Sequence, residues 1–246
     1  FVESMGVDMS ESVRSEAEFT SFNDFICREI DLSRRPVDRD PAVCVAPADG
    51  RVLAFGCVGE QDTFAIKRHQ FGLGELVGDA ALARRYAGGA MLISRLYLAD
   101  YHHFHFPASG IAGSPRRVEG KYLAVSPYAR RRIVPWLTEN TRVLTELASD
   151  AFGRILMIEV GAFTVGSIQQ RFPPATRVGK GDPKGFFELG GSVVVLLFER
   201  GRIRLDPDLC DFTRVGVETF VRLGESIGRA PARGRSRALE FSGKIG

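Results

Sequence analysis

The chain has 246 residues, of which 44% are hydrophobic and 26% are charged, and its formal net charge is +3. This length suits one large domain or two small ones, and the composition is that of an ordinary globular protein with a substantial buried core. The small net charge gives no reason to expect nucleic acid as a partner, and no apolar window approaches the roughly 18 residues of a membrane-spanning helix.

Helices are predicted near both ends of the chain and once in between. Residues 8–30 are expected to be helical, because apolar side chains recur there at steps of three and four. Prolines then interrupt the pattern, and a second helix is expected over about residues 79–86, before a Gly-Gly pair. A third, amphipathic helix is expected over residues 208–227.

Short β-branched runs, separated by glycine and proline, predict strands between these helices. They are expected at residues 43–45, 51–55, 63–66, 90–96, 120–125, 142–147, 154–160, 166–170 and 193–198. Many short strands without regular helix alternation favour an α+β protein with a mainly antiparallel β core, barrel-like or sandwich-like, and helices at both ends. No repeat or composition shift marks a second domain, so a single domain is expected over residues 1–228.

The ends of the chain and its cysteines bear on where the protein works. The four cysteines form no Cys-x-x-Cys pair, which is typical of reduced thiols in a cytosolic protein. The sequence starts at Phe1 rather than methionine, so an upstream anchor or targeting segment stays open. Residues 229–246 are basic and aperiodic, and are expected to be a disordered tail, with contact to an anionic membrane as the alternative.

Three of the four histidines are clustered, at His102, His103 and His105. In a regular strand His103 and His105 would share one face and His102 would lie on the other. An imidazole suits proton transfer near neutral pH, so a general acid or base is expected here, and histidines without chemistry are the alternative. A metal site lacks an obvious third ligand at this spacing, and no metal is expected.

Ser192 follows a glycine pair and stands directly before an unbroken apolar run over residues 193–198. Glycine lets a backbone carbonyl be approached closely, and a hydroxyl at the mouth of a buried strand suits attack on the preceding peptide bond. The alternative interpretation is an ordinary turn followed by a strand, and Gly166-Ser167 is a competing glycine–serine pair.

Asp49 lies in the segment Pro47-Ala48-Asp49-Gly50, which is either an ordinary hairpin turn or the place of a residue that orients a histidine. With Ser192 and the histidines it supplies the parts of an activated serine nucleophile. The sequence has no Gly-x-Ser-x-Gly elbow, no phosphate-binding loop and no strand-linked Gly-x-Gly-x-x-Gly. These gaps argue against an α/β-hydrolase and against nucleotide chemistry.

A series of short segments, in one order from about residue 22 to residue 227, resembles a known family. The segments are Ser21–Phe25 with Arg34–Asp38, Pro47–Val52, Asp100–Pro107, Val160–Ile168, Lys180–Gly185 and Leu189–Ser192. Each segment is weak alone, but their shared order makes chance agreement implausible. The chain resembles the pyruvoyl-dependent, self-cleaving phosphatidylserine decarboxylases.

The resemblance implies that Asp49, His105 and Ser192 form a maturation triad. His105 would be the base for Ser192, and Asp49 would hold the imidazole in the correct tautomer. The serine hydroxyl would attack the carbonyl of Gly191, and an N-to-O acyl shift followed by elimination and hydrolysis would leave a pyruvoyl group and ammonia. The products would be a β chain, residues 1–191, and an α chain, residues 192–246, that remain associated.

The implied activity is that of a carboxy-lyase, which converts phosphatidylserine into phosphatidylethanolamine and CO₂. The pyruvoyl group, covalently derived from Ser192, would condense with the substrate amine and accept the electrons left by CO₂. His102, which matches the first histidine of the family motif, would contact the substrate carboxylate or protonate the product. The resemblance also implies a homodimer, held peripherally on the cytoplasmic side of a membrane and bound to phosphatidylserine in its surface.

Val193 departs from the family pattern, in which threonine usually follows the cleavage serine. Serine supplies the attacking oxygen, so Val193 does not forbid cleavage, but it is compatible with slower maturation. Two other functions stay open: a soluble relative that decarboxylates a free amino acid, and a silent binding or structural domain that never cleaves.

Overall fold

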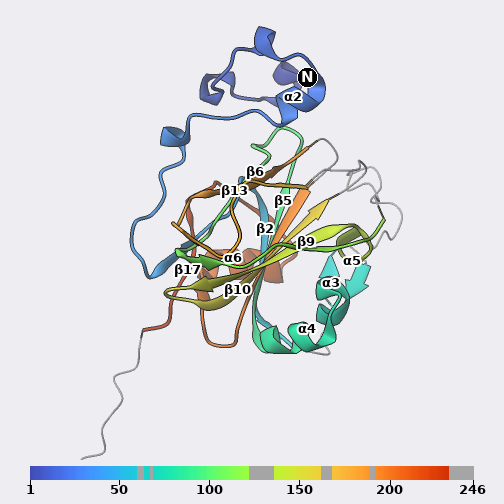
Figure 1. The fold of residues 1–246 in the computed structure, drawn as a ribbon, viewed down its shortest axis with the longest axis vertical. Helices are drawn as coiled ribbons and strands as arrows, with labels where there is room; N and C mark the ends of the chain where they lie inside the picture. The colour runs from blue at the N-terminus through green and yellow to red at the C-terminus, as the bar shows by residue number, and fades with distance from the viewer. Residues whose placement is uncertain (60–63, 67–68, 122–135, 162–167, 189–191, 233–246) are drawn as a thin grey trace, which may run out of the picture.

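The computed structural model describes residues 1–59, 64–66, 69–121, 136–161, 168–188 and 192–232 (Figure 1). A nine-stranded sheet, antiparallel throughout, forms the centre of the molecule. Its strands, in spatial order, are β12 (Thr176–Val178), β7 (Gly110–Ala112), β9 (Arg142–Ser149), β10 (Gly153–Gly161), β14 (Ser192–Phe198), β5 (Gly89–Leu96), β2 (Gly50–Val58) and β16 (Thr219–Val221), with β8 (Arg116–Val118) paired to β9.

Strand β14 is buried along its whole length, because both faces of the sheet are covered. From Val194 onward its even-numbered side chains pack in the larger hydrophobic core, and its odd-numbered side chains pack in a second core with the helices α3 (Leu73–Val77) and α4 (Ala80–Tyr86). A strand that is buried on both faces has no polar side, which explains the unbroken apolar run in the sequence.

Smaller sheets surround the large one in the part of the chain that the structure describes. The sheet that bears on the candidate site is formed by β11 (Ile168–Gln170), β13 (Pro183–Phe187) and β6 (His103–His105), and its Phe104 and Phe187 pack in the larger core. The others are β1 (Val43–Val45) with β17 (Ser226–Arg229) and β15 (Arg204–Leu205), and the pair β3 (Phe64–Ile66) and β4 (His69–Phe71).

The expected fold class is confirmed, since the sheets dominate and the helices are few and short. Most predicted strands lie within a few residues of an observed one, and the helix predicted over residues 79–86 is α4. The strand expected at residues 120–125 falls mostly outside the described residues, and residues 166–167 of another lie outside them too. No described helix has both the length and the apolar character that crossing a membrane requires.

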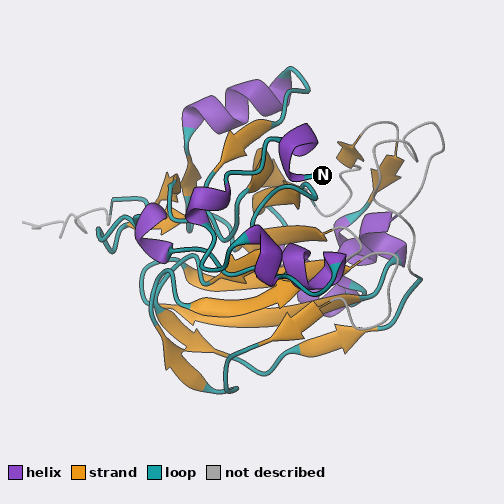
Figure 2. Cartoon of the chain, turned by 90° about the horizontal axis from the view of Figure 1, so that it is seen from above, coloured by secondary structure: helices purple, strands orange, loops and turns teal. Residues whose placement is uncertain are grey.

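The helix predicted over residues 8–30 is wrong. In that range the structure instead has three short pieces, the 3₁₀ turns η1 (Met9–Glu11) and η2 (Glu16–Glu18) and the helix α2 (Phe22–Ile26), with α1 (Val2–Met5) before them and the 3₁₀ turn η3 (Leu32–Arg34) after them. Serine and aspartate side chains cap several of these pieces. These local hydrogen bonds favour several short helical turns instead of one continuous helix. This N-terminal segment sits beyond one end of the large sheet (Figure 1) and lies over it when the molecule is seen from above (Figure 2).

The C-terminal helix predicted over residues 208–227 is also wrong beyond its first half. Helix α6 (Pro207–Arg214) ends before Gly216, which adopts a positive φ of 77° that suits glycine and stops the helix. The remaining residues form β16 and β17. Arg229, placed in the disordered tail by the sequence, is paired within β17 and forms an ion pair with Asp40, while residues 233–246 lie outside the described part.

Candidate active site

The large sheet brings Asp49 and Ser192 to the same end. Arg95, next to the last residue of β5, pairs with Arg51 on one side and with Val193 on the other. Asp49 comes two residues before Arg51, and Ser192 comes one residue before Val193. The strands that carry the two candidates are therefore two strand spacings apart, about 10 Å.

Ser192 is the first residue of β14, and its side chain is fully buried. It pairs with Gly161 at the end of β10 and with Leu96 at the end of β5. Its Oγ is buried and has no hydrogen-bond partner among the described residues. A buried hydroxyl normally finds a partner. The hydroxyls of Ser94, Thr145 and Thr219 are also buried without one, so it is the place of Ser192, directly after the expected scissile bond, that makes it the candidate. Gly191, on the other side of the expected scissile bond, lies outside the described residues.

His102 is buried just before β6, with one ring nitrogen occupied and one free. Its Nδ1 lies 3.0 Å from the carbonyl oxygen of Asp100, and because a carbonyl only accepts, Nδ1 carries the proton. Its Nε2 is buried, and no hydrogen-bond partner for it lies in the part of the chain that the structure describes. Burial lowers the pKa of His102 to about 4, and the nearby charge of Arg28 adds to the effect. At neutral pH this imidazole is uncharged, with a free lone pair.

The backbone ties His102 to the chain that leads to Ser192. The N–H of Phe187, the last residue of β13, donates to the carbonyl oxygen of His102 at 2.8 Å. Arg28, itself buried, donates to the carbonyl of Ala99 at 2.6 Å and so holds the loop in front of the histidine. These contacts fix His102 at the end of the sheet where β14 begins.

His105 lies on β6, which turns Phe104 into the larger core, so His103 and His105 share the opposite face as the strand spacing predicts. Nδ1 of His105 donates to the carbonyl of Gly181 at 2.9 Å, which leaves Nε2 unprotonated, 3.5 Å from the hydroxyl of Tyr101. Burial lowers the pKa of His105, while the bond to Gly181 and the charge of Asp49 oppose that shift.

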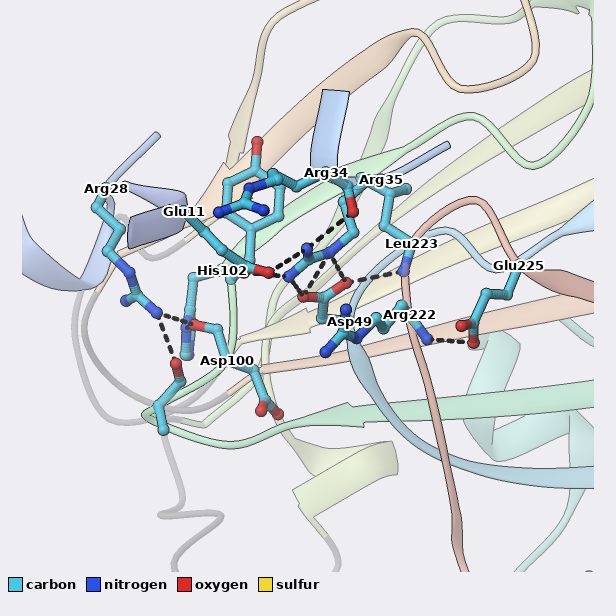
Figure 3. Close-up of polar contacts among 12 residues, drawn as sticks. Glu11, Arg28, Arg34, Arg35, Asp49, Asp100, His102, Arg222, Leu223 and Glu225 are labelled. Carbon is cyan, nitrogen blue, oxygen red and sulfur yellow. Dashed lines mark hydrogen bonds and ion pairs between the residues drawn. The ribbon is translucent and has the colours of Figure 1, made fainter. Parts of the chain in front are cut away.

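Asp49 is buried and fully engaged by other groups (Figure 3). Arg35 donates to both of its carboxylate oxygens, and the backbone N–H of Leu223 donates to Oδ1 at 2.8 Å. Among the described residues no hydrogen bond joins Asp49 to His105. Gly181 rather than Asp49 therefore sets the tautomer in this structure, which differs from the role expected for Asp49, and Asp49 acts on the imidazole through its charge.

A cleft of about 280 Å³ opens beside Asp49, between the N-terminal segment and the strand ends. Arg35 and Tyr101 line it, and neither was singled out from the sequence as a site residue. Both lie inside segments that resemble the family, Arg35 next to Pro36 and Tyr101 next to His102, and this position in the sequence could have identified them. Within the described ranges no group of three His, Cys, Asp or Glu side chains is placed to hold a metal ion.

An unpartnered buried serine hydroxyl, two buried histidines and a buried carboxylate at one end of a sheet make this a candidate serine-nucleophile site. The family model for phosphatidylserine decarboxylase matches residues 22–229. The chain is 44% identical over 230 residues to a phosphatidylserine decarboxylase proenzyme of Chlamydia felis (strain Fe/C-56), covering 94% of this chain and 77% of that protein.

Two further relatives carry the same name. The proenzyme of the same name from Clostridium beijerinckii (strain ATCC 51743 / NCIMB 8052) is 40% identical over 228 residues, which cover 93% of this chain and 77% of that protein. The one from Chlamydia muridarum (strain MoPn / Nigg) is 44% identical over 229 residues, 93% of this chain and 76% of the relative. The chain belongs to the phosphatidylserine decarboxylase family.

Proposed function

We propose that this chain is a proenzyme that cleaves itself between Gly191 and Ser192 and then decarboxylates phosphatidylserine to phosphatidylethanolamine and CO₂. The observation that carries the proposal is the buried, unpartnered Oγ of Ser192 at the strand end shared with Asp49 and His102. The names of the relatives, which are proenzymes of this activity, support it.

In the proposed cleavage, His105 accepts the proton of Ser192 at Nε2, the nitrogen that the Gly181 bond leaves free. The serine oxygen bonds to the Gly191 carbonyl carbon, and the peptide C–N bond breaks as the acyl group moves from nitrogen to oxygen. The imidazolium of His105 returns the proton to the nitrogen that leaves. Loss of the Ser192 α-proton then expels the Gly191 carboxylate, and water hydrolyses the dehydroalanine that remains to the pyruvoyl group and ammonia. The negative charge of Asp49 stabilises the imidazolium that forms on His105.

The residues present fit a pyruvoyl group made from Ser192. Position 192 begins a strand that is paired on both sides, so a group at this new N-terminus is fixed in place, and the unpartnered Nε2 of His102 offers a buried polar atom at the same strand end. A pyruvoyl carbonyl supplies an electron sink for the electrons left by CO₂. Neutral His102 is proposed to hold the substrate carboxylate or to deliver a proton to the product carbon.

The two fragments are proposed to stay together as one folded domain. Strand β14 of the α chain is hydrogen-bonded to β10 and β5 of the β chain along all of its residues from 192 to 198. Phe1, Met5 and Phe22 are exposed on the N-terminal segment, which supports peripheral contact with a membrane surface. A homodimer and a position on the cytoplasmic side of the membrane complete the proposal.

The test is the intact mass of the purified chain under denaturing conditions. We expect two fragments, residues 1–191 and residues 192–246, the second with a blocked N-terminus. A single uncleaved chain from folded protein would favour the silent binding domain. Release of CO₂ from phosphatidylserine vesicles, compared with free amino acids, separates the lipid enzyme from a soluble amino-acid decarboxylase.

A further inference from the structure

Arg35 forms hydrogen bonds with the carboxylate of Asp49 from one side (Figure 3). Its Nε donates to Oδ1 and Oδ2 at 3.0 and 3.1 Å, and its Nη2 donates to Oδ2 at 2.7 Å. The two side chains are only 6% and 4% exposed. A fork of this kind fixes both the position and the rotation of a carboxylate, which a single point charge does not do.

Glu11 holds the other edge of the same guanidinium. Nη1 and Nη2 of Arg35 donate to its two carboxylate oxygens at 2.9 and 2.7 Å, and Nη1 also donates to the carbonyl of Arg34 at 3.2 Å. All five N–H bonds of the guanidinium are therefore matched. Rotation of Arg35 away from Asp49 would break the contacts to Glu11 as well.

Glu11 reaches this position because the N-terminal segment is clipped to the chain just before Arg35. The backbone N–H of Asp31 donates to the carbonyl of Glu11 at 2.8 Å, and Ser12 forms an antiparallel bridge with Ile30. The clip lies partly outside the region matched by the family model, which begins at residue 22.

The cluster carries two carboxylates and one guanidinium, so one negative charge is left over. Asp49 is the carboxylate whose charge acts on His105, where it favours the protonated imidazole. The other charged or titratable groups that face His105 are Asp182, Tyr101 and His103. Changes at Arg35 or Glu11 leave those three groups in place, so their effect on His105 comes from the cluster of Glu11, Arg35 and Asp49.

We propose that Arg35 is a positioning residue for self-cleavage and that Glu11, from the segment ahead of the family region, completes its grip on Asp49. This inference rests on the proposed function. On this proposal the N-terminal segment belongs to the maturation site, because it sets both the orientation of Asp49 and the charge beside His105.

The experiment follows cleavage of the full chain, made by cell-free synthesis and transferred to buffers that span the titration of histidine. Arg35→Gln leaves two uncompensated carboxylates, so the acidic limb of the rate profile should move to higher pH, by about half a pH unit. Glu11→Gln removes the surplus charge, so the limb should move to lower pH. Arg35→Lys keeps the charge without the fork, and should cleave more slowly than the wild type with the limb unmoved.

Arg14→Gln is the matched control, because Arg14 makes a similar two-pronged pair with Asp24 in the same segment, away from Asp49. It should cleave as the wild type does. Slower cleavage of Arg35→Gln and Glu11→Gln with an unmoved limb would reduce the pair to a structural role and overturn the inference. If circular dichroism shows Arg35→Gln unfolded, the opposite shift in Glu11→Gln still decides. An uncleaved wild type would refute the proposed function instead.

Discussion

Polar groups at the strand ends differ in their hydrogen bonding from those in the neighbouring cluster of Glu11, Arg35 and Asp49. At the strand ends, Oγ of Ser192 and Nε2 of His102 are buried without partners. In the cluster, every donor of Arg35 is matched, and Asp49 accepts four hydrogen bonds. Unpaired buried groups cost stability, and Ser192 and His102 are the two such groups that the proposed chemistry uses, whereas Asp49, which acts through its charge, is held by hydrogen bonds.

The largest effect is expected from removal of the unpaired hydroxyl of Ser192. Ser192→Ala should abolish cleavage and decarboxylation completely, because no hydroxyl remains to attack. Ser94→Ala is the matched control, since Oγ of Ser94 is also buried without a partner and Ser94 pairs with Val194 in the same sheet. Ser94→Ala should cleave as the wild type does. A denaturing gel of both variants is the measurement, and an uncleaved Ser94→Ala would show that loss of cleavage does not by itself identify Ser192 as the nucleophile.

The next largest effect is expected from loss of the base, His105, or of Asp49, whose charge supports that base. His105→Ala and Asp49→Ala should each arrest maturation, with more residual cleavage in Asp49→Ala, because that residue acts through charge and not through the proton transfer itself. The fraction cleaved over time measures both. Cleavage at the wild-type rate in either variant would remove that residue from the site.

His102→Ala should separate the two chemistries. Its free Nε2 is assigned to the substrate, so the variant should still yield both fragments, yet lose decarboxylation by about 10²–10⁴-fold. Fragment yield and CO₂ release are measured on the same preparation. A variant that fails to cleave, or that decarboxylates normally, would contradict this division between His102 and His105.

The smallest effect concerns stability and pH. Burial lowers the pKa of His102 and of His103 to about 4, below their ordinary value of 6.5, so between these pH values the unfolded chain binds protons that the folded chain does not. Stability should therefore be full above pH 6.5 and fall toward pH 4, by up to about 1.4 kcal/mol per pH unit for each histidine. Urea unfolding of the uncleaved Ser192→Ala chain measures this slope, and in a His103→Phe background the slope should be shallower.

Sequence patterns predicted the sheet well, because β-branched runs such as residues 193–198 are buried on both faces and leave little choice of structure. They failed at residues 8–30 and 215–227, where apolar spacing looked helical but capping side chains and Gly216 decided the local conformation. Asp49, His102, His105 and Ser192 were predicted as site residues from motifs. Arg35 and Glu11 were not, because their pairing joins positions 24 residues apart through tertiary structure.

The position of strand β14 determines how the cleaved molecule can refold. It begins at the proposed cut and lies in the middle of the sheet, and the chain after it also supplies β16 and β17. Before cleavage the fold forms by a unimolecular reaction. After cleavage, refolding requires two separate chains to meet, so its rate depends on protein concentration. Maturation thus turns a unimolecular folding reaction into a bimolecular one, so an unfolded mature enzyme is lost more readily than an unfolded precursor.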